Sequence, residues 1–138
     1  MKSIKWILAM MITGLFVTSC LDDEPTLNVD YEYAPIDSIT IDEIRPAREV
    51  TEIRTYFTRN SECETFFDYD YQISGNERTV SIVISDLQVE DCLNISEASS
   101  HILQFRPETG GTYTFRFWAG NDVNNEPIFI VQEIEIPN

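Results

Sequence analysis

Residues 64–85 read "ETFFDYDYQISGNERTVSIVIS", two alternating runs around a short polar turn. Successive side chains of a strand point to opposite faces, so a period of two predicts half-buried β-strands. In the first run we expect an inward set and an outward set: Phe67, Tyr69, Tyr71 and Ile73 against Asp68, Asp70 and Gln72. Gly75 and Asn76 both accept positive φ, so they predict the tip of an antiparallel hairpin.

The same period recurs on both sides of this hairpin. Five further runs lie at 36–44, 50–58, 101–105, 112–120 and 127–137. Their alternation and that of 78–85 assign these residues to the core: Ile39, Ile41, Ile53, Phe57, Val80, Ile82, Ile84, Leu103, Phe105, Tyr113, Phe115, Phe117, Ile128, Ile130, Ile134 and Ile136. Residues 86–100 lack a clear period, and "ISEASS" within them could form a short helical turn.

Seven short strands in about 100 residues, with no long helix, predict an all-β fold. We expect a seven-stranded antiparallel immunoglobulin-like or fibronectin-like sandwich over residues 36–138. The stretch "TGGTYTFRF" resembles the tyrosine corner of such folds, which predicts that the Tyr113 hydroxyl bonds to an upstream backbone group. The buried Trp and the inter-sheet disulfide of antibody domains have no counterpart in this pattern, so bacterial Ig-like modules are the nearer resemblance.

The N-terminus has the pattern of a signal peptide over residues 1–19. Two lysines precede a twelve-residue block, 6–17, that is apolar except for Thr13 and Gly14. A membrane span needs about 20 such residues, whereas a signal peptide needs fewer. A short buried helix is the alternative, although the block shows no amphipathic face.

Residues 17–20, "VTSC", resemble the lipobox of bacterial lipoproteins, which predicts lipidation of Cys20. An ordinary secretion signal with an incidental cysteine is the alternative. The acids at 22–24 resemble the surface-export tether of Bacteroidota-type lipoproteins, with a plain solvated linker as the alternative. We expect residues 20–35 to form an extended, lipidated, acidic tether.

The chain after the signal peptide is strongly acidic. It contains seven arginines, no lysine and all 24 acids, which gives a formal charge of −17. Such a domain repels phosphate backbones, so we expect no nucleic-acid partner. It also repels anionic lipid surfaces, so we expect membrane contact through the N-terminal lipid alone.

Cys63 and Cys92 remain as an even pair and predict a disulfide in an oxidising compartment. With Gly75 and Asn76 at the hairpin tip, the numbers of two residues that face each other across the hairpin sum to about 151. Cys63 would then lie opposite residue 88. Cys92 follows four positions later, where the chain can bend back. Two free thiols are the alternative. A zinc site is not expected from two cysteines and one distant histidine.

Several polar or aromatic residues are candidate sites. Trp118 and Arg116 alternate with core phenylalanines, so they face outward and could stack on a sugar or anchor a protein partner. Cover by the tether or by a neighbouring strand is the alternative. We expect no catalysis from His101, since no serine lies in a nucleophile-elbow context, nor from the strand pair Asp68 and Asp70.

Two further motifs are weaker. In "GNDVNNEP", the oxygens of Asp122, Asn124 and Glu126 resemble part of a calcium loop, but the closing bidentate acid is missing and the motif is also a good turn. "DSI" resembles the tripeptide that Bacteroidota-type secreted proteins O-glycosylate, which makes Ser38 a candidate. No cofactor is expected.

The spans 61–80 and 92–122 together resemble small uncharacterised lipoproteins of Bacteroidota, with two cysteines, a Gly-Thr-Tyr-Thr-Phe strand and a Phe-Trp ending. The resemblance implies an Ig-like domain at the cell envelope and no particular activity. We therefore expect an outer-membrane lipoprotein, surface-exposed or alternatively periplasm-facing. Its expected role is non-enzymatic, as a structural module or as one that binds a protein or glycan. An accessory subunit or small hydrolase acting on extracellular glycans is the alternative.

Overall fold

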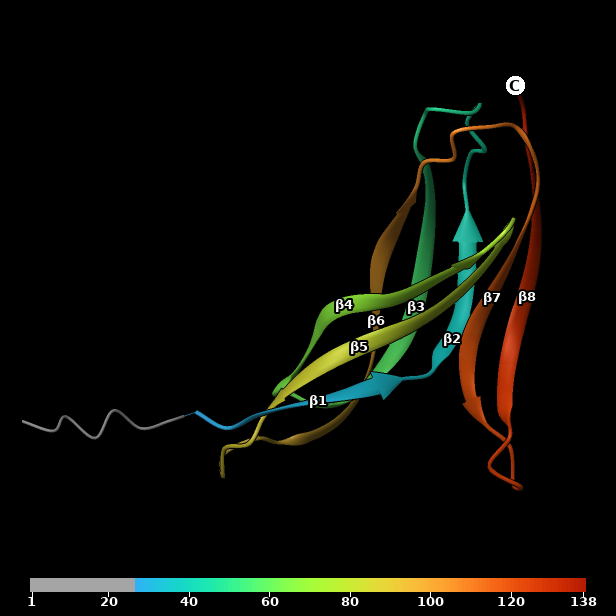
Figure 1. Ribbon diagram of the computed structural model, residues 1–138. Helices are drawn as coiled ribbons and strands as arrows, with labels where there is room; N and C mark the ends of the chain where they lie inside the picture. Colours follow the sequence, from blue (N-terminus) through green and yellow to red (C-terminus); the bar gives the residue numbers. More distant parts are fainter. Residues whose placement is uncertain (1–26) are drawn as a thin grey trace, which may run out of the picture.

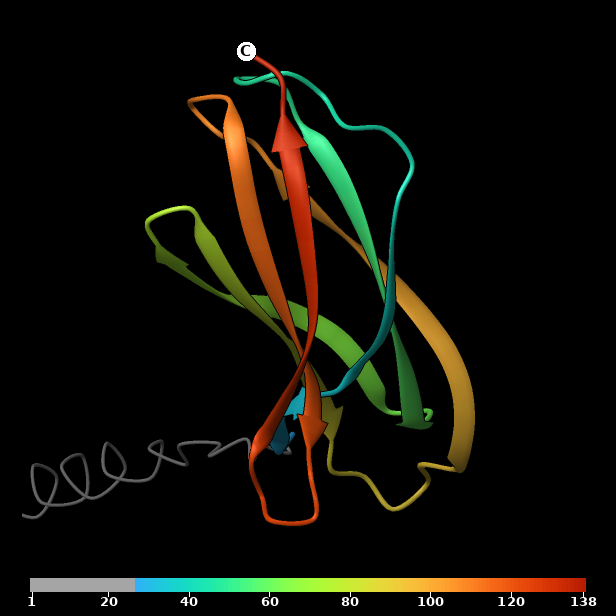
Figure 2. The same cartoon turned by 90° about the vertical axis from the view of Figure 1, so that its right-hand side faces the viewer.

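The computed structural model describes residues 27–138, which form two β-sheets packed face to face (Figures 1 and 2). The eight strands are β1 (Val29–Ala34), β2 (Ile36–Ile41), β3 (Thr51–Ser61), β4 (Glu64–Ser74), β5 (Glu77–Leu87), β6 (Asn94–Phe105), β7 (Gly111–Asn121) and β8 (Pro127–Ile136). One sheet has the order β2-β3-β6, and the other five strands form the second sheet. The expected all-β, sandwich-like architecture is confirmed. Residues 27–138 contain no helical segment with the length and hydropathy of a transmembrane span.

The five-stranded sheet is organised around β5. One edge of β5 pairs antiparallel with β4 along its whole length. The other edge is shared: residues 77–80 pair parallel with β7, and residues 82–87 pair antiparallel with β1. β8 then pairs antiparallel with β7. The expectation of a wholly antiparallel, seven-stranded sandwich is therefore wrong in two respects, namely the parallel pair and the additional strand β1.

β1 comes from the segment that was expected to be tether. Val29–Ala34 pairs with β5, so the sheet begins seven residues before the expected start of the domain at Ile36. Its pattern was hidden because acids alternate with tyrosines and no aliphatic run marks it. After Pro35 the chain enters β2 in the other sheet, and both Ala34 and Ile36 are buried. The first segment of the domain therefore joins the two layers.

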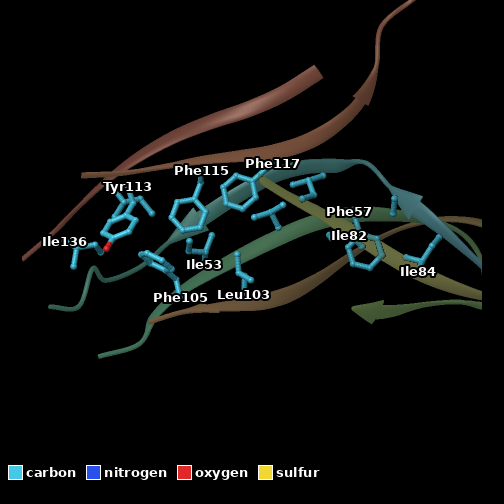
Figure 3. Close-up of a cluster of buried hydrophobic side chains, with 14 residues drawn as sticks. Ile53, Phe57, Ile82, Ile84, Leu103, Phe105, Tyr113, Phe115, Phe117 and Ile136 are labelled. Carbon is cyan, nitrogen blue, oxygen red and sulfur yellow. The ribbon is translucent and has the colours of Figure 1, made fainter. Parts of the chain in front are cut away.

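The core fills the space between the sheets (Figure 3). Twelve predicted core residues are buried there: Ile53, Phe57, Val80, Ile82, Ile84, Leu103, Phe105, Tyr113, Phe115, Phe117, Ile134 and Ile136. Phe115 lies at its centre, with its ring 4.9 Å from that of Phe105 in an edge-on arrangement and 5.6 Å from that of Phe117 in a stacked one. Ile39, Ile41 and Ile130 pack against this cluster and are partly buried.

Three residues assigned to the core are exposed instead. A β-bulge between Phe66 and Asp68 puts two residues of β4 opposite one of β5, so Phe66 turns inward and Phe67 outward. Phe67 is 56% exposed, whereas Tyr69 and Tyr71 keep their inward packing. Ile73 is 65% exposed beside the hairpin tip, and Ile128, also exposed, is the second residue of β8. Strand ends project beyond the opposing sheet, which periodicity alone does not reveal.

β6 is longer than expected. Residues 95–100, for which a short helical turn was one reading, continue the ladder with β3, where Ala98 faces Thr58 and Glu97 faces Arg59. Most of their side chains are exposed, so the segment has no buried face to impose a period of two. Its main-chain pairing with β3 holds it extended, a tertiary contact that overrides the local pattern.

The predicted hairpin and disulfide are both confirmed. From Asp68↔Val83 to Ser74↔Glu77 the facing numbers sum to 151, and Gly75 takes a φ of 58° at the tip. Beyond the bulge the facing residue numbers sum to one less, which places Cys63 opposite Leu87. The Cys63 carbonyl accepts a hydrogen bond from the Leu87 N–H at 3.3 Å. Cys63 and Cys92 form a disulfide with their Cα atoms 5.7 Å apart, which joins the β3–β4 turn to the β5–β6 loop.

Tyr69 of β4 gives the inner face a pH-sensitive group. Its hydroxyl lies 2.7 Å from Thr55 Oγ1, and burial raises the pKa of Tyr69 although that hydrogen bond opposes the shift. Because the unfolded chain loses this proton first, stability should fall as the pH rises past about 10. We expect Tyr69→Phe to reduce this fall, measured as urea midpoints at pH 9, 10 and 11. Tyr56→Phe, on the outer face of β3, is the control. An equal decline in the two variants would contradict the assignment.

Candidate functional site

Aromatic side chains gather on the outer face of the five-stranded sheet. We call this cluster the aromatic patch; it consists of Tyr31 and Tyr33 of β1, Phe67 of β4, Trp118 of β7 and Phe129 of β8. The rings of Tyr31 and Phe67 are 4.6 Å apart, and those of Tyr33 and Trp118 are 6.0 Å apart. Trp118 and Phe129 face each other across the β7–β8 ladder. Four strands therefore contribute to one apolar surface.

Small side chains on β5 explain why rings from β1 and β4 meet. Tyr31 lies opposite Ser85, and Tyr33 lies opposite Val83, so the middle strand carries little bulk on this face. β1 and β4 are separated by two strand spacings, roughly 10 Å, a gap that only long side chains leaning inward can close. Tyr31 and Phe67 do so while each remains more than half exposed.

Polar groups lie at the patch beside the rings. The Tyr33 hydroxyl donates a 2.9 Å hydrogen bond to Asp70 Oδ2, and this bond, together with the carboxylate charge, raises the pKa of Tyr33. The Arg116 guanidinium lies 4.4 Å from the centre of the Phe129 ring, and its Nη1 lies 4.0 Å from a Glu77 carboxylate oxygen. Its Nε is buried without a hydrogen-bond partner. A carboxylate acceptor, guanidinium donors and exposed ring faces therefore lie next to one another on this surface.

Arg116 and Trp118 both lie on this outer face, as the alternation predicted. The alternative, that a neighbouring segment covers Trp118, also holds in part, since Tyr33 packs against it in a T-shaped arrangement and Trp118 is half-buried. The Trp118 Nε1–H donates to Asn121 Oδ1 at 3.1 Å. Sequence reasoning missed Tyr31, Tyr33 and Phe67. Two signals in the sequence could have found them. The first is the alternation in "VDYEYA". The second is the adjacent pair Phe66 and Phe67, because a β-bulge there turns one ring to each face of the sheet.

The calcium candidate lies in the β7–β8 turn. Asp122 Oδ1 accepts the backbone N–H groups of Asn124 at 2.7 Å and of Glu126 at 2.9 Å. These bonds, that from Glu126 foremost, lower the pKa of Asp122. The carboxylate therefore organises the turn, and calcium binding there stays a prediction. Over the part of the chain that the structure describes, no three His, Cys, Asp or Glu side chains are grouped so as to hold a metal.

The remaining candidates are separate from one another. Ser38 is exposed on β2, so its glycosylation stays a prediction. The Tyr113 hydroxyl donates to the Thr109 carbonyl, four residues upstream, at 2.9 Å, which is the bond expected of it. His101 stacks on Phe66 with ring centres 3.6 Å apart, on the opposite face of β4 from Asp70.

Comparison of this chain with protein-family models, with curated proteins and with solved structures gave no match.

Proposed function

We propose that this chain is a lipid-anchored, non-enzymatic module of the bacterial cell envelope that binds a neutral glycan through the aromatic patch. The observation that carries the proposal is the exposure of Tyr31, Tyr33 and Phe67 together on one sheet face. Contiguous exposed apolar surface rimmed by polar groups marks interaction sites on soluble domains. Exposed rings here have no role in the core, which is filled from the other face.

A glycan fits the patch by its chemistry. The C–H faces of sugar rings pack on aromatic faces, while their hydroxyls need planar hydrogen-bonding side chains close by. Asp70 and Arg116 supply an acceptor and a donor within the patch. A neutral glycan suits a chain whose charge after the signal peptide is −17, since an anionic polymer would be repelled.

The envelope location is supported by the N-terminal sequence and by the cystine. A hydrophobic block followed by "VTSC" favours lipidation at Cys20, and the Cys63–Cys92 disulfide favours an oxidising compartment. Nine residue steps separate Cys20 from Val29, which bridge at most about 30 Å. The patch would therefore lie close to the membrane that holds the lipid.

We also propose that the sandwich is a variant of the immunoglobulin-like arrangement. The order β2-β3-β6 corresponds to the A-B-E sheet of that fold, and Tyr113 near the start of β7 occupies the place of its tyrosine corner. The parallel pairing of β5 with β7 is the departure from it. Because β7 pairs with only the first part of β5, the rest of that edge is free to pair with β1. β1 contributes two rings to the aromatic patch.

Glycan binding is tested by presenting the full chain, in mild detergent, to an array of neutral oligosaccharides. We expect a saturable signal that falls at least tenfold in the double variant Tyr31→Ala, Trp118→Ala, because two ring faces are lost. Tyr56→Ala on the outer face of the other sheet is the matched control and should bind as wild type. Retained binding in the double variant would contradict the site. A patch-dependent protein ligand with no glycan signal would contradict the glycan assignment.

Anchoring is tested by metabolic labelling with palmitate. We expect label in the wild-type chain and none in Cys20→Ala, because that sulfur is the acceptor of the first lipid. Cys63→Ala should remain labelled and controls for loss of any cysteine. Equal labelling of wild type and Cys20→Ala would remove the envelope location from the proposal while leaving the glycan result intact.

A further inference from the structure

Arg78 of β5 is nearly buried and has no acidic partner. It is 9% exposed, and no carboxylate in residues 27–138 lies within ion-pairing distance of it. Nη1 donates to the main-chain carbonyls of Gly75 at 2.7 Å and Glu77 at 2.8 Å. The Tyr71 hydroxyl is a further hydrogen-bond partner of this guanidinium, but none of its five N–H donors has a carboxylate from the described part of the chain. In a chain with 24 acids and seven arginines, such an arginine requires an explanation.

Aromatic rings partly compensate the buried charge. The guanidinium carbon lies 5.2 Å from the centre of the Tyr113 ring and 5.9 Å from that of Phe105. Cation–π contacts and carbonyl dipoles make the burial tolerable, but neither neutralises the positive charge. The charge therefore remains available to an anion that reaches it.

A cleft of about 480 Å³ opens onto Arg78. Its walls are the β4–β5 hairpin near its tip, the end of β6 and the start of β7. Apolar and aromatic side chains make up much of the lining: Tyr71, Ile73, Leu103, Phe105 and Tyr113. A volume of this size accommodates a small organic ligand.

The mouth of the cleft is polar. Gln104, Arg106, Pro107 and Glu108 complete the lining, so the charged groups there are one further cation and one carboxylate. The Arg106 Nε–H donates to the Arg48 carbonyl at 2.8 Å, which fixes this second guanidinium near the rim. Two of the seven arginines therefore line one cleft, against a single acid.

We propose that this cleft binds a small monocarboxylic acid with an apolar or aromatic body, with its carboxylate on Arg78. The planar guanidinium offers two parallel N–H groups, which match a carboxylate better than a spherical or strongly hydrated anion. The apolar walls contact the body of the ligand. A dianion would meet the negative field of the whole chain with only one buried cation to oppose it. This site lies between the two layers and is separate from the aromatic patch.

The experiment is a titration of the full chain with phenylacetate, followed by ¹H–¹⁵N NMR, with phenylacetamide as a neutral probe of the same shape. We expect saturable shifts at the amides of residues 103–106, and binding of the amide at least tenfold weaker. Arg78→Met, which keeps much of the apolar stem, should abolish carboxylate binding. Similar affinity for both probes, or no saturable shift with phenylacetate, would overturn the proposal.

A second pair of variants keeps the test decisive if Arg78→Met fails to fold. Gln104 is exposed at the cleft mouth, so Gln104→Glu adds one negative charge there without disturbing the core. We expect it to weaken phenylacetate binding about fivefold, the effect of one nearby charge in a solvated setting. Gln72→Glu, an exposed position of β4 outside the cleft lining, is the matched control and should bind as wild type. Equal affinity of the two variants would contradict a carboxylate site.

Discussion

Replacing Cys63 and Cys92 together by serine is expected to lower the free energy of unfolding by about 3–4 kcal/mol. The disulfide closes a loop with a sequence separation of 29, so its loss restores much of the conformational entropy of the unfolded chain. The measurement is urea denaturation of the double variant and of wild type under oxidising conditions.

The same disulfide can be checked without mutation. Under reducing conditions the wild-type midpoint should fall to that of the double variant, while the double variant itself should not respond to reductant. The intact mass of the oxidised protein should be two hydrogens below that of the reduced form. Two free thiols in the protein purified without reductant, or equal midpoints throughout, would show that the cystine does not stabilise the fold.

Phe115→Ala is expected to lower the free energy of unfolding by about 3–5 kcal/mol, because it leaves a cavity at the centre of the core. Phe115 is fully buried between Phe105 and Phe117, and the sheets that hold these rings cannot close the gap. The measurement is again a urea midpoint, supplemented by thermal unfolding.

Phe67→Ala is the matched control for Phe115→Ala. The same atoms are removed, but Phe67 is largely exposed and contacts chiefly Tyr31, so a loss of only about 0.5–1.5 kcal/mol is expected. Similar losses in the two variants would contradict the assignment of Phe115 to the inner face and Phe67 to the outer face of the five-stranded sheet.

Local alternation predicted the parts of the fold in which one strand face is buried and the other is not. The hairpin, the inward faces of β3, β5 and β7, and the cystine all followed from periods of two and a turn. The parallel pairing of β5 with β7 did not, because register between strands distant in sequence leaves no local pattern. The bulge at Phe67 escaped for a related reason: two adjacent aromatics fit either face until the pairing partner is known.

The candidate sites were predictable to the same extent. Arg116 and Trp118 were found because they alternate with buried phenylalanines. The other rings of the patch were not predicted, because Phe67 faces outward through a bulge and Tyr31 and Tyr33 lie in a segment that was expected to be tether. Arg78 was overlooked although it shares the parity of Val80 in β5, so the alternation itself places a guanidinium on the inner face. A charged residue that alternates with core residues along a strand is therefore a candidate for a buried functional group.

β1 has a mechanical consequence, since it is both the first strand of the sheet and the direct continuation of the chain from Cys20. Under the function proposed above, tension between the membrane and a bound glycan would act along β1 and load its six-residue pairing with β5 in shear, so that its hydrogen bonds must break together. The end of that pairing nearest Cys20 is reinforced, because the Gln88 N–H donates to the Asn28 carbonyl and the Cys63–Cys92 disulfide constrains the loop that follows β5. With the anchor proposed at Cys20, these contacts would let the sandwich resist a pull on its N-terminus.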